Sequence, residues 1–391
     1  IIIPLIFEKL GKGEDEAKRF TSSIFSAFSL ALVIFSALVW VLAPFLVEKA
    51  FPGFRGTNTE TTILLLTRIM LLQPIFLGIS NFFAGITQTY NKFFVYALSP
   101  LLYNIGIIVG VVYLYPLMGI TGLAWGVVLG AVLHLSIQLP ALFGTSIFPT
   151  FTFKINWREV WQVMKISLPR TIGLAANNLS TFALVSLGSI IGVGSISVFT
   201  LSWNLQSVSL SIIGASYSMA AFPTLSKLFS AGKNSEYMDS VRSAMKHIIF
   251  WSMPALVLFI VLRAQIVRVV LGFGQFDWSD TRLTAASLAL FSVSIVAQGA
   301  IVLLSRAYYA SGKTAKPLIS NVLGAVLAVI FAAVFAKLMS ANQTFQYFIE
   351  SLLKVDGVKG TKVLMLPLGY SLATILNLAL LWYLFKKDFS F

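Results

Sequence analysis

Residues 23–47 read SIFSAFSLALVIFSALVWVLAPFLV and contain no Asp, Glu, Lys or Arg. A run of about 20 apolar residues is long enough to cross the hydrocarbon core of a bilayer as a helix. The whole chain shares this character, since its 391 residues are 58% apolar and 11% charged, whereas a soluble domain carries about 25% charged residues. The sequence therefore predicts an all-α integral membrane protein and excludes soluble enzymes, nucleic-acid binders and disordered chains.

Further apolar runs predict a polytopic helical bundle with about ten complete spans and one partial span at residues 1–7. The complete spans are expected near residues 23–47, 61–85, 93–116, 119–143, 166–190, 196–225, 248–272, 281–309, 317–340 and 364–385. Because the chain opens within an apolar span, without the basic region and cleavage site of a signal peptide, we expect the sequence to be truncated at its N-terminus.

Two connectors are longer than the rest. Residues 144–165, which contain Trp157-Arg158-Glu159, predict an interfacial amphipathic segment, and residues 341–363 predict an external polar loop. The first connector divides the chain into two blocks of spans, as in transporters built from repeats. The predicted divisions are an N-terminal lobe (1–143), an interfacial cytoplasmic linker (144–165), a C-terminal lobe (166–385) and a cytoplasmic tail (386–391).

The net charge of +14 is distributed unequally between the two sets of connectors. Sixteen Lys and Arg fall in one set of connectors and the tail, and six in the opposite set. Cytoplasmic loops carry the excess of basic residues. We therefore expect the loop after residue 7 and the C-terminus of this chain in the cytoplasm, and most of the loop lysines to act only as topology signals.

Residues that could perform covalent chemistry are scarce. The chain has no Cys, two His and 14 acids, and none of the acids falls in the middle of the ten complete spans. No GxxxxGK[ST] motif is present. We therefore expect a transporter rather than an enzyme, with no catalytic residues, no metal and no cofactor. Glu8, at the inner end of the partial span, is the nearest candidate for a gate or a charge partner.

Two arginines are expected inside the membrane, where charge is costly and usually functional. Arg68 falls about seven residues into its span, which is roughly 10 Å of helix. Arg170 falls about four residues into its span, directly after Pro169. Either side chain could extend to the nearer interface, or it could meet backbone carbonyls, an acid from another helix, or an anionic ligand.

Polar residues accompany these arginines. The positions 204, 207 and 211 share one helical face, since they are spaced i, i+3 and i+7. Such a stripe faces protein, through interhelical hydrogen bonds, or it lines a hydrophilic cavity. The candidate residues for binding an anionic head group in a cavity are Arg68, Asn104, Arg170, Asn177, Asn178, Asn204 and Gln206.

Several short motifs occur in a characteristic order. Phe7-Glu8-Lys9-Leu10-Gly11-Lys12-Gly13 precedes Glu16-Ala17, then Ala43-Pro44 precedes Pro52-Gly53-Phe54. Pro100-Leu101-Leu102-Tyr103-Asn104, Phe222-Pro223-Thr224-Leu225-Ser226 and Arg306-Ala307-Tyr308-Tyr309-Ala310 follow, with Thr314 and Pro317 after the last. This order resembles the MurJ (MviN) family of lipid II flippases over essentially the whole chain.

The resemblance implies the fold of the multidrug/oligosaccharidyl-lipid/polysaccharide exporter (MOP) superfamily, which is MATE-like, with two lobes in a V around a central cavity. It implies that the chain lacks the first span, most of the second and the last two. It implies a flippase that moves undecaprenyl-pyrophosphate-linked peptidoglycan precursor (lipid II) from the inner to the outer leaflet by alternating access, for cell-wall biosynthesis. The implied location is the bacterial inner membrane, with lipid II and membrane lipids as partners, cell-wall synthesis proteins as candidate partners, and no nucleic acid.

One position departs from the family pattern. Several members carry an Asp-Arg pair in the eighth family span, and the corresponding residues here are Trp203 and Asn204. This change removes one expected ligand for pyrophosphate, and Arg170 could supply the missing charge. The alternatives are an exporter of another polyprenyl-linked oligosaccharide and a non-transporting degenerate homologue.

Overall fold

The computed structural model describes residues 2–90, 92–192 and 194–389, without the side chains of residues 2–4, 93, 166, 169, 170 and 172–177. The described residues form helices joined by short connectors and include no β-strand. The chain divides into two compact units: residues 1–50 with 54–172 form unit 1, and residues 51–53 with 173–391 form unit 2. The lobe, linker and tail boundaries expected from the sequence stay a prediction.

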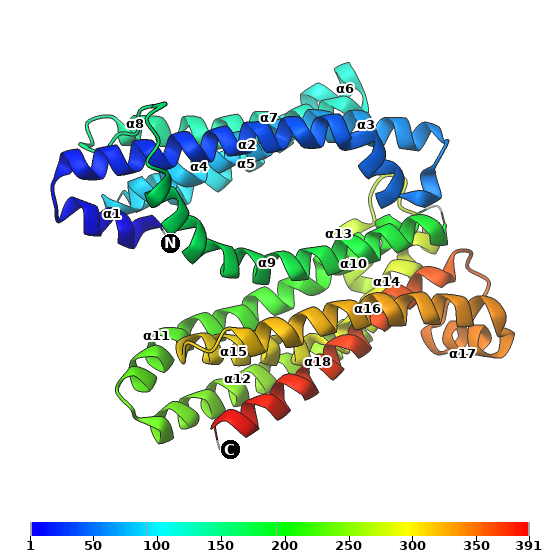
Figure 1. The fold of residues 1–391 in the computed structure, drawn as a ribbon. Coiled ribbons are helices and arrows are strands. Elements are labelled where there is room, and N and C mark those ends of the chain that lie inside the picture. The colour runs from blue at the N-terminus through cyan, green and yellow to red at the C-terminus, as the bar shows by residue number, and fades with distance from the viewer. Residues whose placement is uncertain (1, 91, 193, 390–391) are drawn as a thin grey trace. The chain divides into compact units, whose positions relative to one another are not determined.

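Unit 1 is built from the first helices of the chain (Figure 1). They are α1 (Ile2–Leu10), α2 (Glu14–Ala50), α3 (Asn58–Met70), α4 (Leu72–Thr89), α5 (Phe93–Val109), η2 (Gly110–Leu114), α6 (Tyr115–Met118), α7 (Ile120–Ser136), α8 (Gln138–Leu142) and the first part of α9 (Trp157–Ile191). The short helix η1 (Pro52–Phe54) lies between α2 and α3.

Unit 2 contains the last part of α9 and the helices that follow it. They are α10 (Ser195–Ser209), η3 (Leu210–Ala215), α11 (Ser216–Ser230), α12 (Asn234–Val261), α13 (Arg263–Leu271), α14 (Trp278–Ser292), α15 (Ile295–Ala310), α16 (Ala315–Ala341), α17 (Gln343–Leu353), η4 (Thr361–Leu364) and α18 (Met365–Phe389). Helices α16 and α18 lie side by side in Figure 1.

The predicted membrane spans are largely confirmed. Among the described residues, eight helical stretches are long and apolar enough to cross a membrane. The pair α14–α15, bent by 44° at its break, can be a ninth. The one predicted span that is not among these nine, residues 166–190, lies on α9. Residues 178–191 of this helix form a shorter apolar stretch, and several of the side chains before residue 178 are outside the described set. The all-helical, polytopic fold class follows.

Two sequence predictions are wrong in detail. The span expected at 248–272 is displaced, because α12 covers Asn234–Val261 and the helix breaks at Leu262, before the polar helix α13 begins. The connector 341–363 is not a plain loop, because it contains helix α17. Asn342 caps this helix by accepting a hydrogen bond from the backbone N–H of Phe345 at 3.1 Å, and Leu353 packs into the core.

Close helix packing in unit 1 depends on glycine. A Cβ atom at Gly106 would lie 2.2 Å from the Cα of Gly130, and one at Gly110 would lie 2.5 Å from the Cα of Gly126. Helices α5 and α7 therefore pack backbone against backbone, as small residues allow in membranes. Gly110 also begins η2, a π-helical turn between α5 and α6.

Helix α2 buries hydroxyl groups as well as apolar side chains. Thr21, Ser22, Ser23 and Ser26 are all buried on its N-terminal half, and among the described residues no other helix supplies their hydrogen bonds. Instead, three of them accept from backbone N–H groups of the connector that follows α8. These contacts make residues 147–156 part of unit 1 rather than a free linker.

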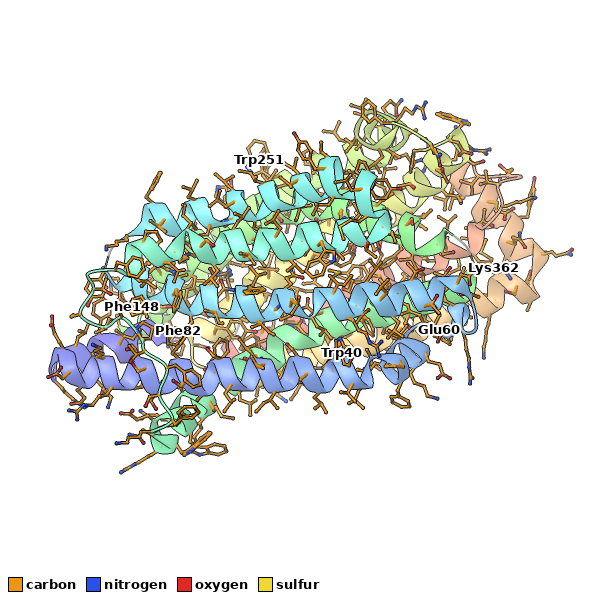
Figure 2. All side chains as sticks on the ribbon, turned by 90° about the horizontal axis from the view of Figure 1, so that it is seen from above. Trp40, Glu60, Phe82, Phe148, Trp251 and Lys362 are labelled. Carbon is orange, nitrogen blue, oxygen red and sulfur yellow. The ribbon has the colours of Figure 1, made fainter. Side chains whose placement is uncertain are left out.

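Hydrophobic packing closes the same end of unit 1. Phe82 of α4 and Phe148 of the connector lie toward this end in Figure 2. Both belong to a core that also includes buried Ile24 and Ile147. Phe82 packs against Phe25 with 5.5 Å between ring centroids.

We expect the Gly110→Ala variant to destabilise the protein by about 1–3 kcal/mol, because the added methyl group would force two backbones apart. The measurement is thermal unfolding of the purified protein in detergent. Gly188→Ala is the matched control, since its Cβ would meet neighbouring side chains no closer than 3.4 Å. Equal midpoints for the two variants would contradict the glycine packing.

Candidate functional site

Arg68 is the embedded cation that the structure describes. It lies on α3 within the membrane-spanning stretch Asn58–Thr89, ten residues or roughly 15 Å of helix from the start. Its side chain is partly buried, and its Cζ atom is 4.5 Å from the ring centroid of Trp40 on α2. The guanidinium is therefore stabilised by a cation–π contact inside the membrane.

Arg68 keeps an unused hydrogen-bond donor. Its Nε atom is buried and has no hydrogen-bond partner among the described residues. The acid nearest to Arg68 in sequence is Glu60. Its carboxylate accepts a hydrogen bond from the backbone N–H of Gly56 at 2.6 Å. Figure 2 shows Glu60 at the start of α3 and Trp40 near the same end of α2. An embedded arginine without a carboxylate partner is well suited to an anionic ligand.

Asn104, on α5, is exposed. The neighbouring Tyr103 behaves differently, because its hydroxyl accepts a hydrogen bond of 2.9 Å from Nε2 of Gln73 on α4. The structure therefore uses Tyr103 to join two helices of unit 1 and leaves the amide of Asn104 accessible.

The polar stripe on α10 and η3 is accessible rather than buried between helices. Asn204 and Ser211 are exposed, and Ser207 is partly exposed. The two serine hydroxyls donate to backbone carbonyls one turn earlier, Ser207 to Asn204 at 2.7 Å and Ser211 to Ser207 at 2.9 Å. The side-chain amide of Asn204 has no such bond among the described residues.

Gln206 lies on the opposite side of α10 from this stripe and is fully buried. Its Oε1 accepts from Nε2 of Gln298 on α15 at 3.1 Å, and the same Nε2 donates to Ser294 at 2.9 Å. Gln206 Nε2 and Gln298 Oε1 have no partner among the described residues. Gln206 therefore holds α10 to the break between α14 and α15, while its role as a direct substrate ligand stays a prediction.

Trp203 is a core residue. Its ring lies 4.9 Å from Tyr370, 5.5 Å from Phe291 and 6.2 Å from Phe199, measured between centroids. The partly buried tryptophan thus packs between α10, α14 and α18, whereas Asn204 is exposed.

The remaining candidates are dispersed or outside the described set. The side chains of Arg170 and Asn177 lie outside the described residues. Asn178 is exposed on α9. Glu8 is exposed and pairs with Lys12, with 3.1 Å between Oε1 and Nζ, so its role as a gate or charge partner stays a prediction.

Sequence reasoning missed Trp40 as the partner of Arg68. The two residues are on different helices, and no spacing rule connects positions so far apart in the chain. The only available signal was the need of an embedded guanidinium for a compensating group, and an aromatic ring satisfies that need as well as an acid does.

Comparison with known proteins gives consistent results. The chain matches the family described as "Lipid II flippase MurJ" over residues 1–391. A probable lipid II flippase MurJ from Buchnera aphidicola subsp. Acyrthosiphon pisum is 28% identical over 314 residues, which cover 79% of this chain and 61% of the relative. The corresponding protein from Bdellovibrio bacteriovorus is 26% identical over 386 residues, covering 96% of this chain and 69% of the relative. The chain thus spans about three fifths of the Buchnera protein.

Solved structures show the same fold. A lipid II flippase MurJ in an inward closed conformation superimposes with a TM-score of 0.78 at 24% identity, covering 100% of this chain and 77% of that one. An inward-facing multidrug resistance MATE family transporter of the MOP superfamily superimposes with a TM-score of 0.79 at 14% identity, covering 99% and 84%. The MATE-like membrane fold expected from the sequence is confirmed.

We expect Trp40→Leu to lower the free energy of unfolding by about 0.5–2 kcal/mol through the lost cation–π contact. The loss should largely disappear in an Arg68→Gln background, because the partner charge is then already absent. The double-mutant cycle is measured by thermal unfolding in detergent. Additive effects of the two substitutions would show that the ring and the guanidinium do not interact.

Proposed function

This chain belongs to the lipid II flippase MurJ family, and we propose that its protein moves lipid II from the inner to the outer leaflet of the bacterial inner membrane by alternating access. The proposed orientation places the connector after α1 and the C-terminal end of α18 in the cytoplasm, following the excess of basic residues on that side. Peptidoglycan synthesis is the process that this step would serve.

The observation that carries the proposal is the state of Arg68. A pyrophosphate group cannot cross hydrocarbon unaided, because removing an ion from water is costly unless other groups replace its hydration. Arg68 offers an embedded positive charge with an unused Nε donor and no described carboxylate partner. Such a donor can form the charge-assisted hydrogen bonds that a phosphate requires.

Exposed amides support the same role. Asn104 on α5, Asn178 on α9 and Asn204 on α10 are all exposed. Amides in direct contact with lipid tails would be unfavourable, so we assign Asn104 to a hydrated surface of unit 1, and Asn178 and Asn204 to a hydrated surface of unit 2. The prenyl tail can stay in lipid during the cycle, because only the polar head needs replacement contacts.

We expect Arg68→Gln to lower transport by roughly 10- to 100-fold, the equivalent of one lost hydrogen bond to a charged group. Arg68→Lys, which keeps the charge, should retain more activity. The assay expresses the gene encoding this chain in bacteria depleted of their own lipid II flippase and quantifies lipid II in the outer leaflet. Lys313→Gln is the control, since Lys313 lies over the ring of Phe389 at 4.8 Å, at the C-terminal end of α18.

Rescue by the wild type with undiminished activity of Arg68→Gln would remove Arg68 from the site. Failure of the correctly inserted wild type to rescue would instead favour a different polyprenyl-linked oligosaccharide as cargo. Asn204 would then be the first residue to exchange, because it stands where several family members carry a charge.

Arg170 gives a second, separate prediction, which rests on its sequence position after Pro169. Arg170→Ala should abolish transport in the same assay while leaving expression and membrane insertion intact. A well-expressed variant with full activity would refute this role without affecting the role of Arg68.

A further inference from the structure

The first turns of α9 expose a continuous apolar face. Trp157, Trp161, Met164 and Leu168 are 66%, 66%, 50% and 56% exposed. Their spacing of i, i+4, i+7 and i+11 places them on one side of the helix. The opposite side is packed, since Val163 lies against the core of unit 1 and Glu159 pairs with Lys9 of α1.

Basic side chains border this apolar face. Arg158 and Lys165 are exposed and, being seven residues apart, lie along the same edge of it. Lys154, also exposed, precedes the helix. An apolar row of side chains beside a cationic row is typical of an amphipathic helix that lies in the membrane interface.

The acid in this region is neutralised. Glu159 is the one carboxylate between residues 151 and 170 of the sequence. Its Oε1 lies 2.5 Å from Nζ of Lys9 on α1, and Lys9 also contacts Oε1 of Glu16 on α2 at 3.0 Å. The hydrogen bonds that Lys9 donates to Glu159 and Glu16 raise the pKa of Lys9 above its ordinary value, so this cation remains charged. Among the described residues, Glu159 therefore pairs with Lys9 rather than with Arg158 or Lys165.

The connector before α9 fixes the direction of the apolar face. The backbone N–H of Thr152 donates to Ser26 at 2.8 Å, and that of Asn156 donates to Ser23 at 2.8 Å. The N–H of Thr150 donates to Ser22 at 3.0 Å. Because these bonds and Glu159 hold the inner side of α9 against α1 and α2, the tryptophan face is held outward.

Helix α9 is also longer than a bilayer requires. Its 35 residues correspond to about 52 Å, whereas the hydrocarbon core is about 30 Å thick. The segment Trp157–Lys165 contains three charged residues and therefore belongs at the level of the lipid head groups rather than of the tails.

We propose that this face of α9 binds anionic phospholipid, with Trp157, Trp161, Met164 and Leu168 at the boundary of the acyl chains and with Arg158 and Lys165 on the head-group phosphates. The preference is for a net negative lipid such as phosphatidylglycerol over zwitterionic phosphatidylcholine. The inference concerns the surrounding membrane and holds whichever cargo the protein carries.

The test uses the absence of cysteine from the chain. A Met164→Cys variant is labelled with a fluorophore and reconstituted into vesicles, and quenching is compared between nitroxide-labelled phosphatidylglycerol and nitroxide-labelled phosphatidylcholine. We expect phosphatidylglycerol to be enriched at the label by about fivefold or more at low salt, and less at high salt. Adding Arg158→Gln and Lys165→Gln should bring the two lipids to equal quenching.

Two controls separate this site from a general effect of charge. Lys359→Gln with Lys362→Gln removes the same charge from the exposed connector between α17 and α18 and should leave the preference unchanged. A label at Val326→Cys, an exposed position on α16, should be quenched equally by both lipids. Arg158→Lys should retain the preference because the charge is kept.

Equal quenching by the two lipids in the otherwise unchanged protein would overturn the proposal. So would a preference that survives the loss of Arg158 and Lys165, or a label at position 164 that neither lipid quenches. A preference that disappears equally with the Lys359 and Lys362 changes would assign the effect to net charge and also reject the site.

Discussion

The structure depends on one constraint: a polar group that enters hydrocarbon must find its partner inside the protein. A helix satisfies this requirement for the backbone groups in its interior. Where a helix ends, its last backbone carbonyls need partners from side chains. At the break between α14 and α15, Ser371 donates to the carbonyl of Leu290 at 2.7 Å, and Ser294 donates to that of Phe291 at 2.8 Å. Side-chain hydroxyls thus permit a bend of 44° in the middle of an apolar element.

The same constraint explains the hydroxyl-rich start of α2. Ser22, Ser23 and Ser26 accept from the backbone of an extended connector, whose N–H groups would otherwise lack partners. The connector in turn sets the rotation of the first turns of α9. A row of small hydroxyls on one helix therefore determines which face of another helix meets its surroundings.

Arginines that donate to backbone carbonyls differ from Arg68. Arg263 and Arg282 donate to the carbonyls of Leu353 and Lys354 at 2.9 and 2.7 Å, and so complete the C-terminal end of α17. Arg68 instead lies over an aromatic ring and keeps a buried, unused donor. In the first arrangement the guanidinium is engaged by backbone carbonyls, whereas in the second its buried Nε has no hydrogen-bond partner among the described residues.

The sequence by itself determined the membrane class, the positions of most spans and the family resemblance, because apolar runs without charge have one stable solution in a bilayer. It also located Arg68 and the polar stripe that includes Asn204, but it left open whether that stripe is buried between helices or exposed. Only the tertiary structure decided that Gln206 faces inward, that Trp203 fills the core and that Trp40 is the partner of Arg68. The physical reason is that hydropathy reports whether a residue can enter the membrane, whereas its partner there is set by contacts between helices that are distant in sequence. Helix α17 was also missed, because its 11 residues are too short and too polar to be recognised as a span. Contacts with residues distant in sequence, such as the bond from Arg263 to Leu353, hold it in place.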